Sequence, residues 1–528
     1  MSNNLNWRWI LFYLLVAYVH SSSQISTPTS KSYVAAVVEF APSNVANNSK
    51  QTIQSNVARY EKLIQDASAQ TADIIVFPED GITTYHLPQK SEMDSVSTVI
   101  PSARFTPCTQ HLDGMTEELK RLSCAAMKNQ IYVVINIAER VPCYDNECPK
   151  GESLYYNSNV VFDRNGTIIA KYRKQNLFVE PQFSTPKHPE IVTFDTDFGV
   201  TFGTFICFDI LFAVPALNLT RDLGVTDIVY TTAWFSETPF LTAIQTQFGW
   251  AFAENVNFLA AGYNNPLEGN TGSGIYYGSN HTSKVRISHD QTTELIIDRV
   301  PKKVPKNLKT TKNQETKHSE THVHVHDELR RKRQTTNVNN LKLLRDNVTL
   351  YKTEILNGNI SLKTLCHDGH CCNFTVNVNK IDTKVKYRLV VFNGIRNYAN
   401  VRLVGTRVCS IIQCSNDTLE SCGSTLDSQT IFQEINISGK FDQSINSLIM
   451  PNTLRTDLLP IMDFSYEAHS HDDHKHVSIT NSNKAITNLV TFGVYCRDYD
   501  RDIKSAAVSN NIAYSFSILM AFLLLRFW

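Results

Sequence analysis

The pattern of apolar and polar residues between positions 33 and 300 alternates between two periods. Short apolar, β-branched runs typical of buried strands are separated by longer segments whose apolar residues recur at helical spacing. The longer segments predict helices over 51–70, 115–130 and 239–256. The short runs predict strands over 33–40, 73–80, 131–139, 200–208, 226–234 and 257–263, and a hairpin over 156–174. Interleaved strands and helices favour an α/β domain over 33–300, and the hairpin gives it a mixed sheet.

The pattern changes at about Pro301 and again at 341. Residues 301–340 are polar, charged and poor in large apolar residues, which predicts a linker. From 341 to 503, short apolar runs and clustered cysteines predict a second, β-rich domain. The basic run RRKR within the linker is either a convertase site, cut after Arg333, or a solvated basic patch.

Both ends of the chain carry apolar segments typical of export. Residues 1–23 combine Arg8, an apolar run and small residues, which predicts a signal peptide; a signal anchor is the alternative. Residues 504–528 resemble a glycosylphosphatidylinositol (GPI) signal, with attachment at Ser505 or Ser509. A plain membrane span is the alternative for this segment. We therefore expect a secreted protein held at the extracellular face of the cell membrane.

Sequons and charge balance agree with that expectation. The sequon Asn-x-Ser/Thr, at a density that suits a glycoprotein, occurs at Asn47, Asn165, Asn218, Asn280, Asn347, Asn359, Asn373, Asn416 and Asn436. The 50 basic and 50 acidic residues cancel, so the charge gives no reason to expect nucleic acid as a partner.

The 12 cysteines suit an oxidising compartment. Four lie between 108 and 148, where local pairing is plausible, above all between Cys143 and Cys148. Cys207 is the only cysteine between 149 and 365. It is a half-cystine, an inert buried thiol or a nucleophile, and the cysteine count alone does not decide. If Cys207 is free, one of the other 11 must also lack an intramolecular partner.

Two histidine tracts, at 318–326 and 469–476, are candidate weak metal sites. Imidazoles two residues apart can share a divalent ion. Disordered tracts of this composition usually bind nothing specific, and neither tract lies in an evident framework that would fix coordination geometry. The sequence therefore assigns no metal ligands.

Three segments place reactive side chains at the ends of predicted strands. Glu79 follows the strand at 73–80 in FPED, Lys174 follows the hairpin in YRKQNLF, and Cys207 ends the apolar run in GTFICFDI. Strand ends in mixed α/β sheets bring groups together. A carboxylate that takes the thiol proton and a cation that favours the thiolate would activate Cys207, which we then expect to ionise more readily than free cysteine.

These three residues match the Glu–Lys–Cys triad of the nitrilase superfamily of carbon–nitrogen hydrolases. The surrounding FPEDGI, YRKQNLFVEPQF, FGTFICFDILF and TGSGIYY resemble the vanin/biotinidase branch. So do the segments CHDGHCCNF, VCSIIQC and SCG of the second domain. The resemblance covers about residues 33–500, whereas the linker and the tract HSHDDHKH depart from it.

The resemblance implies an αββα sandwich, then a β-rich, disulfide-containing base domain, with no cofactor. It makes Glu79 the general base, Cys207 the nucleophile and Lys174 the cation that stabilises the oxyanion, together with the backbone N–H of Phe208. Glu180 is a candidate second glutamate beside Lys174, although a surface acid is an equal alternative. Three aromatic residues are candidates to line the pocket, with core packing as the alternative: Trp234, Phe235 and Tyr263.

The resemblance also ranks the functions. The first expectation is an amidohydrolase that cleaves a small-molecule amide, pantetheine, through a cysteine thioester. The second is a biotinidase-like enzyme acting on biotinyl-lysine amides. A non-catalytic surface scaffold or metal-binding protein is the third, although no triad member is missing.

Overall fold

The computed structural model describes residues 25–503 apart from 47, 102–103, 144–147, 149–151, 281–282, 305–340, 443–445, 472–473 and 482–483. The predicted signal peptide, the GPI segment with Ser505, the convertase site at Arg333, the tract 318–326 and Asn47 lie outside the described residues. The described chain forms two compact units, 25–346 with 457–462, and 347–456 with 463–503.

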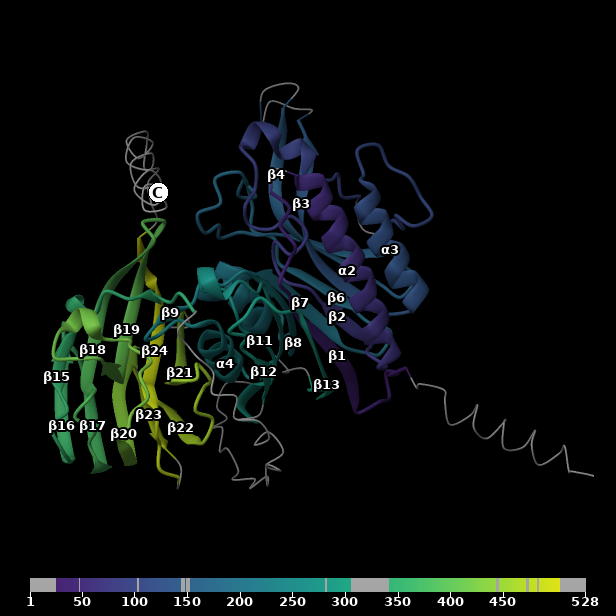
Figure 1. Cartoon of the computed structure of the whole chain (residues 1–528). Coiled ribbons are helices and arrows are strands. Elements are labelled where there is room, and N and C mark those ends of the chain that lie inside the picture. Colours follow the sequence, from purple (N-terminus) through teal and green to yellow (C-terminus); the bar gives the residue numbers. More distant parts are fainter. Residues whose placement is uncertain are drawn as a thin grey trace, which may run out of the picture. The chain divides into compact units, whose positions relative to one another are not determined.

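The first unit contains two six-stranded sheets (Figure 1). The order β13-β1-β2-β3-β4-β5 uses β1 (Ser32–Glu39), β2 (Ile74–Val76), β3 (Tyr132–Pro142), β4 (Ser153–Phe162), β5 (Ile168–Arg173) and β13 (Glu294–Pro301). The order β12-β11-β10-β8-β7-β6 uses β6 (Val192–Asp195), β7 (Thr201–Ile206), β8 (Asp227–Thr232), β10 (Asn257–Gly262), β11 (Ser273–Tyr277) and β12 (Ser283–Arg286). A small third sheet pairs β9 (Glu237–Thr238) with β14 (Leu344–Arg345).

Two hydrophobic cores show how these layers stack. On β1, Val34, Ala36 and Val38 pack toward the helices α2 (Ser49–Ala69) and α3 (Glu117–Asn129). The alternate residues of the same strand, such as Val37, pack toward the second sheet. Helix α4 (Ala243–Glu254) contacts β10 and β11 of the second sheet. The strand period of two thus supplies both cores, and the predicted αββα sandwich is confirmed.

The helices occur where their periodicity predicts them, with ends set by polar caps. Helix α2 begins two residues before the predicted 51, because the Asn48 side chain accepts a hydrogen bond from the Gln51 N–H at 2.9 Å. Helix α4 begins four residues after the predicted 239, because Thr242 and Gln245 form a capping box there.

The second unit is built from two five-stranded antiparallel sheets. One has the order β15-β18-β19-β24-β21, with β15 (Lys352–Ile355), β18 (Lys386–Tyr398), β19 (Arg402–Cys414), β21 (Ser447–Arg455) and β24 (Leu489–Ile503). The other has the order β16-β17-β20-β23-β22, with β16 (Ile360–His367), β17 (His370–Lys380), β20 (Ile431–Asp442), β22 (Phe464–Ser470) and β23 (His474–Asn481). The β-rich second part is confirmed.

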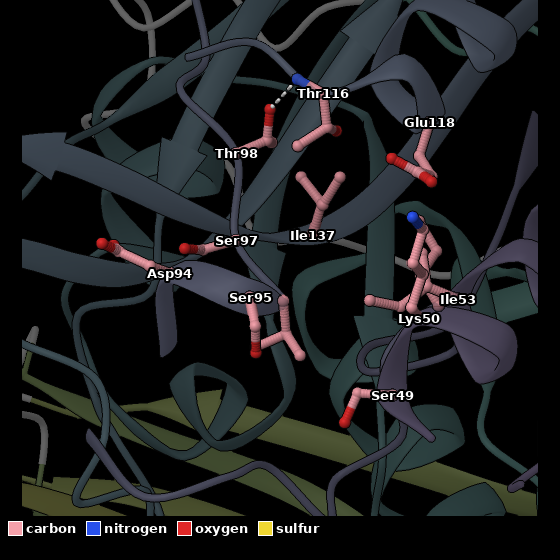
Figure 2. Close-up of a pocket in the computed structure, with 12 residues that line it drawn as sticks. Ser49, Lys50, Ile53, Asp94, Ser95, Ser97, Thr98, Thr116, Glu118 and Ile137 are labelled. Carbon is pink, nitrogen blue, oxygen red and sulfur yellow. Dashed lines mark hydrogen bonds between the residues drawn. The ribbon is translucent and has the colours of Figure 1, made fainter. Parts of the chain in front are cut away.

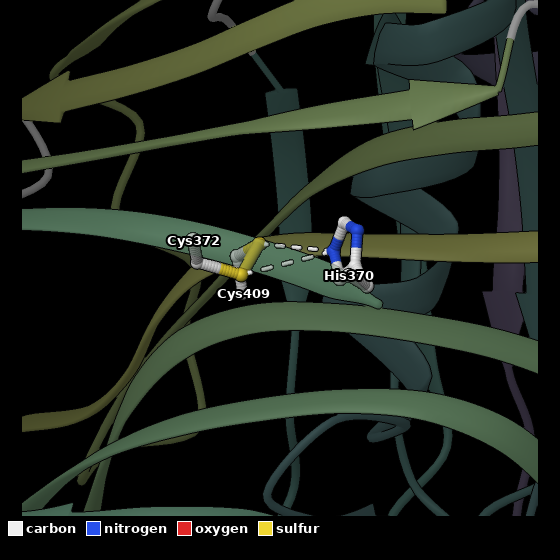
Figure 3. Close-up of side chains that lie close together, drawn as sticks. All are labelled: His370, Cys372 and Cys409. Carbon is white, nitrogen blue, oxygen red and sulfur yellow. Dashed lines mark hydrogen bonds between the residues drawn. A yellow bond between two sulfur atoms is a disulfide. The ribbon is translucent and has the colours of Figure 1, made fainter. Parts of the chain in front are cut away.

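Five disulfides leave two described cysteines free. The disulfides are Cys108–Cys124, Cys143–Cys148, Cys366–Cys371, Cys372–Cys409 and Cys414–Cys422. Cys372–Cys409 joins β17 of one sheet to β19 of the other, beside His370 (Figure 3). Cys207 is therefore not a half-cystine, and the expected second free cysteine is Cys496.

Among the described residues, no helix is both long and apolar enough to cross a membrane. The eight predicted sequon asparagines in the described ranges are exposed or half-buried, so none is enclosed in a core.

Candidate active site

Glu79 lies three residues beyond the end of β2 and is almost completely buried. Its Oε1 accepts hydrogen bonds from the Lys174 ammonium at 2.6 Å and from Asn157 Nδ2 at 2.8 Å. Its Oε2 accepts one from the Ala233 N–H, directly after β8, at 2.8 Å. The carboxylate is thus held by groups from both sheets. The predicted strand 73–80 ends earlier, at Val76, which places Glu79 in the following turn.

Lys174 follows β5 and is buried between two carboxylates. Its Nζ donates to Glu79 at 2.6 Å and to both oxygens of Glu180 at 3.0 Å. Burial by itself would lower the pKa of this amine, but the charges of Glu180 and Glu79 raise it well above its ordinary value. The amine is therefore a permanent cation, and Glu180 is its partner rather than a surface acid.

Cys207 follows β7 and has a left-handed backbone, with φ of +47°. This conformation is rare for a residue with a side chain and costs on the order of 1–3 kcal/mol. The predicted strand 200–208 therefore stops at Ile206, and a short 3₁₀ turn, Cys207–Leu211, begins. The Cys207 carbonyl accepts a hydrogen bond from Tyr230 Oη at 2.9 Å, which helps to hold the turn.

Cys207 is only 7% exposed. Burial raises its pKa well above the ordinary value, the Glu79 charge raises it further, and the Lys174 charge lowers it. The expectation of an easily ionised thiol is therefore wrong, because desolvation outweighs the cation. A reaction at this thiol would require a base to remove the proton, and Glu79 is the carboxylate coupled to it.

Asparagines that sequence reasoning missed connect the strands around this cluster. Asn136 on β3 accepts from the Asp80 N–H at 3.0 Å and donates to Asn157 Oδ1 on β4 at 2.6 Å. Asn157 Nδ2 then donates to Glu79 and, at 2.9 Å, to Glu180. Asn159, on the same face of β4, bonds Thr204 and Thr231 of the second sheet. The spacing Asn-x-Asn inside an apolar strand was the available signal.

Asp209 is a second residue whose role was missed. Its Oδ2 accepts from the Ile206 N–H at 3.1 Å and from Tyr172 Oη at 2.7 Å. Its Oδ1 accepts from the backbone and side-chain N–H groups of Asn176, both at 2.8 Å. Complete burial raises the pKa of Asp209 to about 6. This carboxyl ties the turn that carries Cys207 to the segment that follows Lys174.

Aromatic rings cluster on the segments that carry the site. Phe178 lies 4.9 Å from Phe208 and 6.3 Å from Phe235 between ring centroids, and Tyr85 lies 5.6 Å from Phe235 and 4.8 Å from Tyr263. Of the predicted lining residues, Phe235 and Tyr263 belong to this cluster. The Trp234 indole instead donates to the Leu241 carbonyl at 2.8 Å.

A separate cavity of about 270 Å³ lies beside the N-terminal ends of α2 and α3 (Figure 2). Polar groups from several elements line it, including Lys50, Asp94 and Glu118. The Thr116 N–H donates to Thr98 Oγ1 at 3.0 Å across its wall. Glu79, Lys174 and Cys207 do not line this cavity, so it is distinct from the catalytic cluster.

Two groups of described residues bring three candidate metal ligands together. His370, Cys372 and Cys409 form one, but their sulfurs are joined in a disulfide and are not thiolates (Figure 3). Glu79, Asp80 and Glu180 form the other, and the Lys174 ammonium already contacts two of these carboxylates. A protein cation thus already lies between two of these carboxylates.

Both parts of the chain match models of known protein families. A carbon–nitrogen hydrolase family model matches residues 35–265, and a vanin C-terminal domain model matches 341–502. Vanin-like protein 1 of Drosophila melanogaster is 34% identical, over 95% of this chain and 92% of that protein. The chain belongs to the vanin/biotinidase branch of the nitrilase superfamily. It is a hydrolase of amide carbon–nitrogen bonds.

Two further relatives, a pantetheinase and a biotinidase, have the same sequence identity to this chain as each other. Pantetheinase of Sus scrofa is 31% identical over 92% of this chain and 91% of that protein. Biotinidase of Homo sapiens is 31% identical over 89% of this chain and 90% of that protein. Overall identity therefore does not separate these two relatives.

Proposed function

We propose that this member of the branch is an extracellular amidohydrolase that converts pantetheine to pantothenate and cysteamine through a thioester on Cys207. The observation that carries the proposal is the buried Lys174 ammonium, held by Glu79 and Glu180 and electrostatically coupled to the thiol. The similarity to pantetheinases supports the choice of substrate.

The acylation half begins with the protonated thiol. Glu79 takes the thiol proton while Sγ of Cys207 forms a bond to the amide carbon, and the carbonyl π electrons move to oxygen. The Lys174 ammonium has three N–H donors and contacts three carboxylate oxygens, one of Glu79 and two of Glu180, so it donates to the oxyanion by releasing one oxygen of Glu180. The Phe208 N–H is the second proposed donor. Each such donor lowers the barrier by about 3 kcal/mol.

The intermediate then collapses and releases the amine. The oxyanion electrons re-form the carbonyl, the carbon–nitrogen bond breaks, and the leaving nitrogen takes the proton held by Glu79. This leaves a thioester on Cys207 and an ionised Glu79. A water molecule then gives its proton to Glu79 and attacks the thioester carbon. Collapse of this second intermediate releases the acid, and Cys207 recovers its proton from Glu79.

The experiment is a comparison of two substrates on the purified, solubilised full chain and on its Cys207→Ala variant. We expect thiol release from pantetheine that disappears in the variant, and little cleavage of biotinyl-lysine. The equal similarity to biotinidases makes the reverse preference the second candidate. Cleavage of neither amide would overturn both substrate assignments.

We further propose that the chain is glycosylated and anchored by lipid at the outer face of the membrane. The accessible sequon asparagines support glycosylation, and the small residues around Ser505 support lipid attachment. Treatment of intact cells with a phosphatidylinositol-specific phospholipase should release the activity into the medium. Retention of the activity on treated cells would favour a membrane span. Cleavage after Arg333 should appear as two fragments in a denaturing gel, absent from an Arg333→Ala variant.

A further inference from the structure

The second histidine tract lies on an antiparallel hairpin of β22 and β23. His469 is directly opposite His476 in this ladder, and Ser470 is opposite Lys475. The His471 N–H donates to the His474 carbonyl at 2.8 Å and closes the ladder at the turn. Because both strands continue in register, the four histidines form two cross-strand pairs. The hairpin is thus the framework that the sequence did not reveal.

All four imidazoles lie on one face of this hairpin. Residues two apart on a strand share a face, and directly opposed residues share it as well. The neighbouring Val477 and Ile479 of β23 are completely buried, so the opposite face of the strand packs into the core. The histidine face is therefore the solvent face, and His469 and His471 are exposed on it.

The spacing within the cluster suits a shared ligand. Directly opposed residues have Cβ atoms about 4.5–5.5 Å apart, and residues two apart on one strand are separated by about 7 Å. The rings of His471 and His474 are already stacked, with centroids 4.8 Å apart and planes 19° from parallel. The backbone register therefore places the four histidines around one small patch of the sheet face.

The charges around the patch come from three strands. Glu467 lies two residues before His469 on β22, and its carboxylate oxygen is 3.5 Å from the Nε2 atom of His469. On β20, Lys440 is opposite His476 and Asp442 is opposite His474. The Asp442 carboxylate is paired with Arg407, and Lys475 lies between the two histidines of β23.

We propose that this hairpin binds a divalent late transition-metal ion through imidazole nitrogens of His469, His471, His474 and His476. Imidazole suits Cu²⁺, Ni²⁺ and Zn²⁺, and a flat set of nitrogen donors suits the tetragonal geometry of Cu²⁺. The order of affinities for one nitrogen site also places Cu²⁺ above Zn²⁺. The hairpin therefore binds Cu²⁺ more tightly than Zn²⁺.

Binding requires the rings to turn toward one centre. Among the described residues, three ligand atoms within 4.8 Å of one another occur only in the two groups named above, so these four rings do not yet converge. His469 and His471 are exposed, and exposed side chains change rotamer on the picosecond to nanosecond scale, whereas His474 and His476 are half-buried. The backbone register needs no change. The site is thus preorganised in its backbone and completed by side-chain rotation.

The experiment titrates Cu²⁺ and, separately, Zn²⁺ into the full-length protein at neutral pH. The background variant carries His→Asn at His318, His322, His324 and His326, so that the linker tract cannot contribute. Equilibrium dialysis should show one tight Cu²⁺ ion per chain. Electron paramagnetic resonance of that ion should show hyperfine coupling to several imidazole nitrogens.

The deciding variant adds His469→Asn and His476→Asn, which removes one cross-strand pair. Loss of an outer-shell partner alone typically costs about 10–100-fold in metal affinity, so loss of two direct ligands should cost at least that much. The matched control is His111→Asn, an exposed histidine of the other unit, which should leave affinity unchanged. Unaltered melting of the Asn variants in the absence of metal would show that the fold persists.

Cu²⁺ binding of equal affinity and equal nitrogen coupling after substitution of all four hairpin histidines would overturn the proposal. So would the absence of a tight ion in the background variant. Amide hydrolysis is measured in parallel and should be unchanged in these variants, so the outcome does not depend on the proposed substrate.

Discussion

The chain contains two free cysteines, each followed two residues later by an aspartate. Cys207-Phe208-Asp209 lies in the first unit, and Cys496-Arg497-Asp498 lies in the second. Both thiols are buried, and burial raises the pKa of both, that of Cys496 to about 12. Burial and local sequence are therefore nearly the same at the two sites.

The backbones around these cysteines differ. Cys496 lies inside β24 and is paired with Arg407 on β19 and Ile449 on β21. Its sulfur contacts the Arg497 carbonyl at 3.6 Å. A continuous ladder on both sides holds Cys496 within a sheet, whereas Cys207 has left the ladder at a strand end.

The aspartates that follow the two cysteines, Asp209 and Asp498, also have different partners. Asp498 forms an ion pair with Arg407 at 2.9 Å, but Asp209 binds the backbone just before the nucleophile. Cys207 is coupled to the Glu79 carboxylate and the Lys174 ammonium, whereas the charges that act on Cys496 include those of Arg407 and Asp498, which pair with each other. The proposed nucleophile Cys207 thus differs from Cys496 in its partners and its strand-end position, and not in ready ionisation.

The largest expected effect is the loss of turnover when Cys207, but not Cys496, is replaced by alanine. Cys207→Ala should lower amide hydrolysis by about 10⁴-fold or more, because the bond-forming atom is lost. Cys496→Ala should leave kcat within about twofold and lower stability by about 1 kcal/mol, through loss of a packed sulfur. Steady-state kinetics and chemical denaturation measure the two effects. A Cys207→Ala protein that retains turnover would show that Cys207, like Cys496, is not needed for amide hydrolysis.

The second effect is a difference in kcat between variants of Glu79, the proposed base, and Glu180, the second glutamate beside Lys174. Glu79→Gln should lower kcat by about 10²–10⁴-fold, because glutamine cannot accept the thiol proton. Glu180→Gln should cost about tenfold, because Glu180 positions Lys174 and Asn157 and takes no proton itself, and typical positioning contacts contribute about 1–2 kcal/mol. Steady-state kcat of the two variants is the measurement. Equal losses would mean that both glutamates have one structural role.

The sequence predicts the parts of the site that depend on local pattern. Glu79, Lys174 and Cys207 were found because each follows an apolar run, and Cys143–Cys148 because the residues are close in sequence. The bonds of Asn157 depend on the register between strands. The disulfide Cys372–Cys409 depends on how two sheets face each other. Neither the Asn157 hydrogen bonds nor this disulfide can be predicted from the periodicity of the sequence, because both depend on contacts between segments far apart in the chain.

The third effect is the pH dependence of stability contributed by Asp209. Its pKa rises from an ordinary 3.8 to about 6 on folding, so the folded state holds the proton more tightly. The resulting stabilisation is complete below about pH 4 and is lost as pH rises through about 6. Relative to Asp209→Asn, the wild-type protein should lose up to about 1.4 kcal/mol per pH unit across this window.

Urea unfolding at several pH values measures this difference. Asp113→Asn, at a fully exposed position, is the matched control and should give a curve parallel to that of the wild type. Parallel curves for Asp209→Asn as well would show that its carboxyl does not titrate in the window.

The smallest expected effect is a change in the pKa of the Cys207 thiol when one of its two charged neighbours is removed. The Glu79 charge raises this pKa and the Lys174 charge lowers it. Glu79→Gln should therefore lower the thiol pKa, and Lys174→Met should raise it, although both variants lose turnover. Thiolate absorbance, read as the difference from a Cys207→Ser counterpart of each variant, gives the titration. Cys496 should titrate identically throughout, because neither charge affects it. Shifts of the same sign in the two variants would contradict the opposite effects assigned to Glu79 and Lys174.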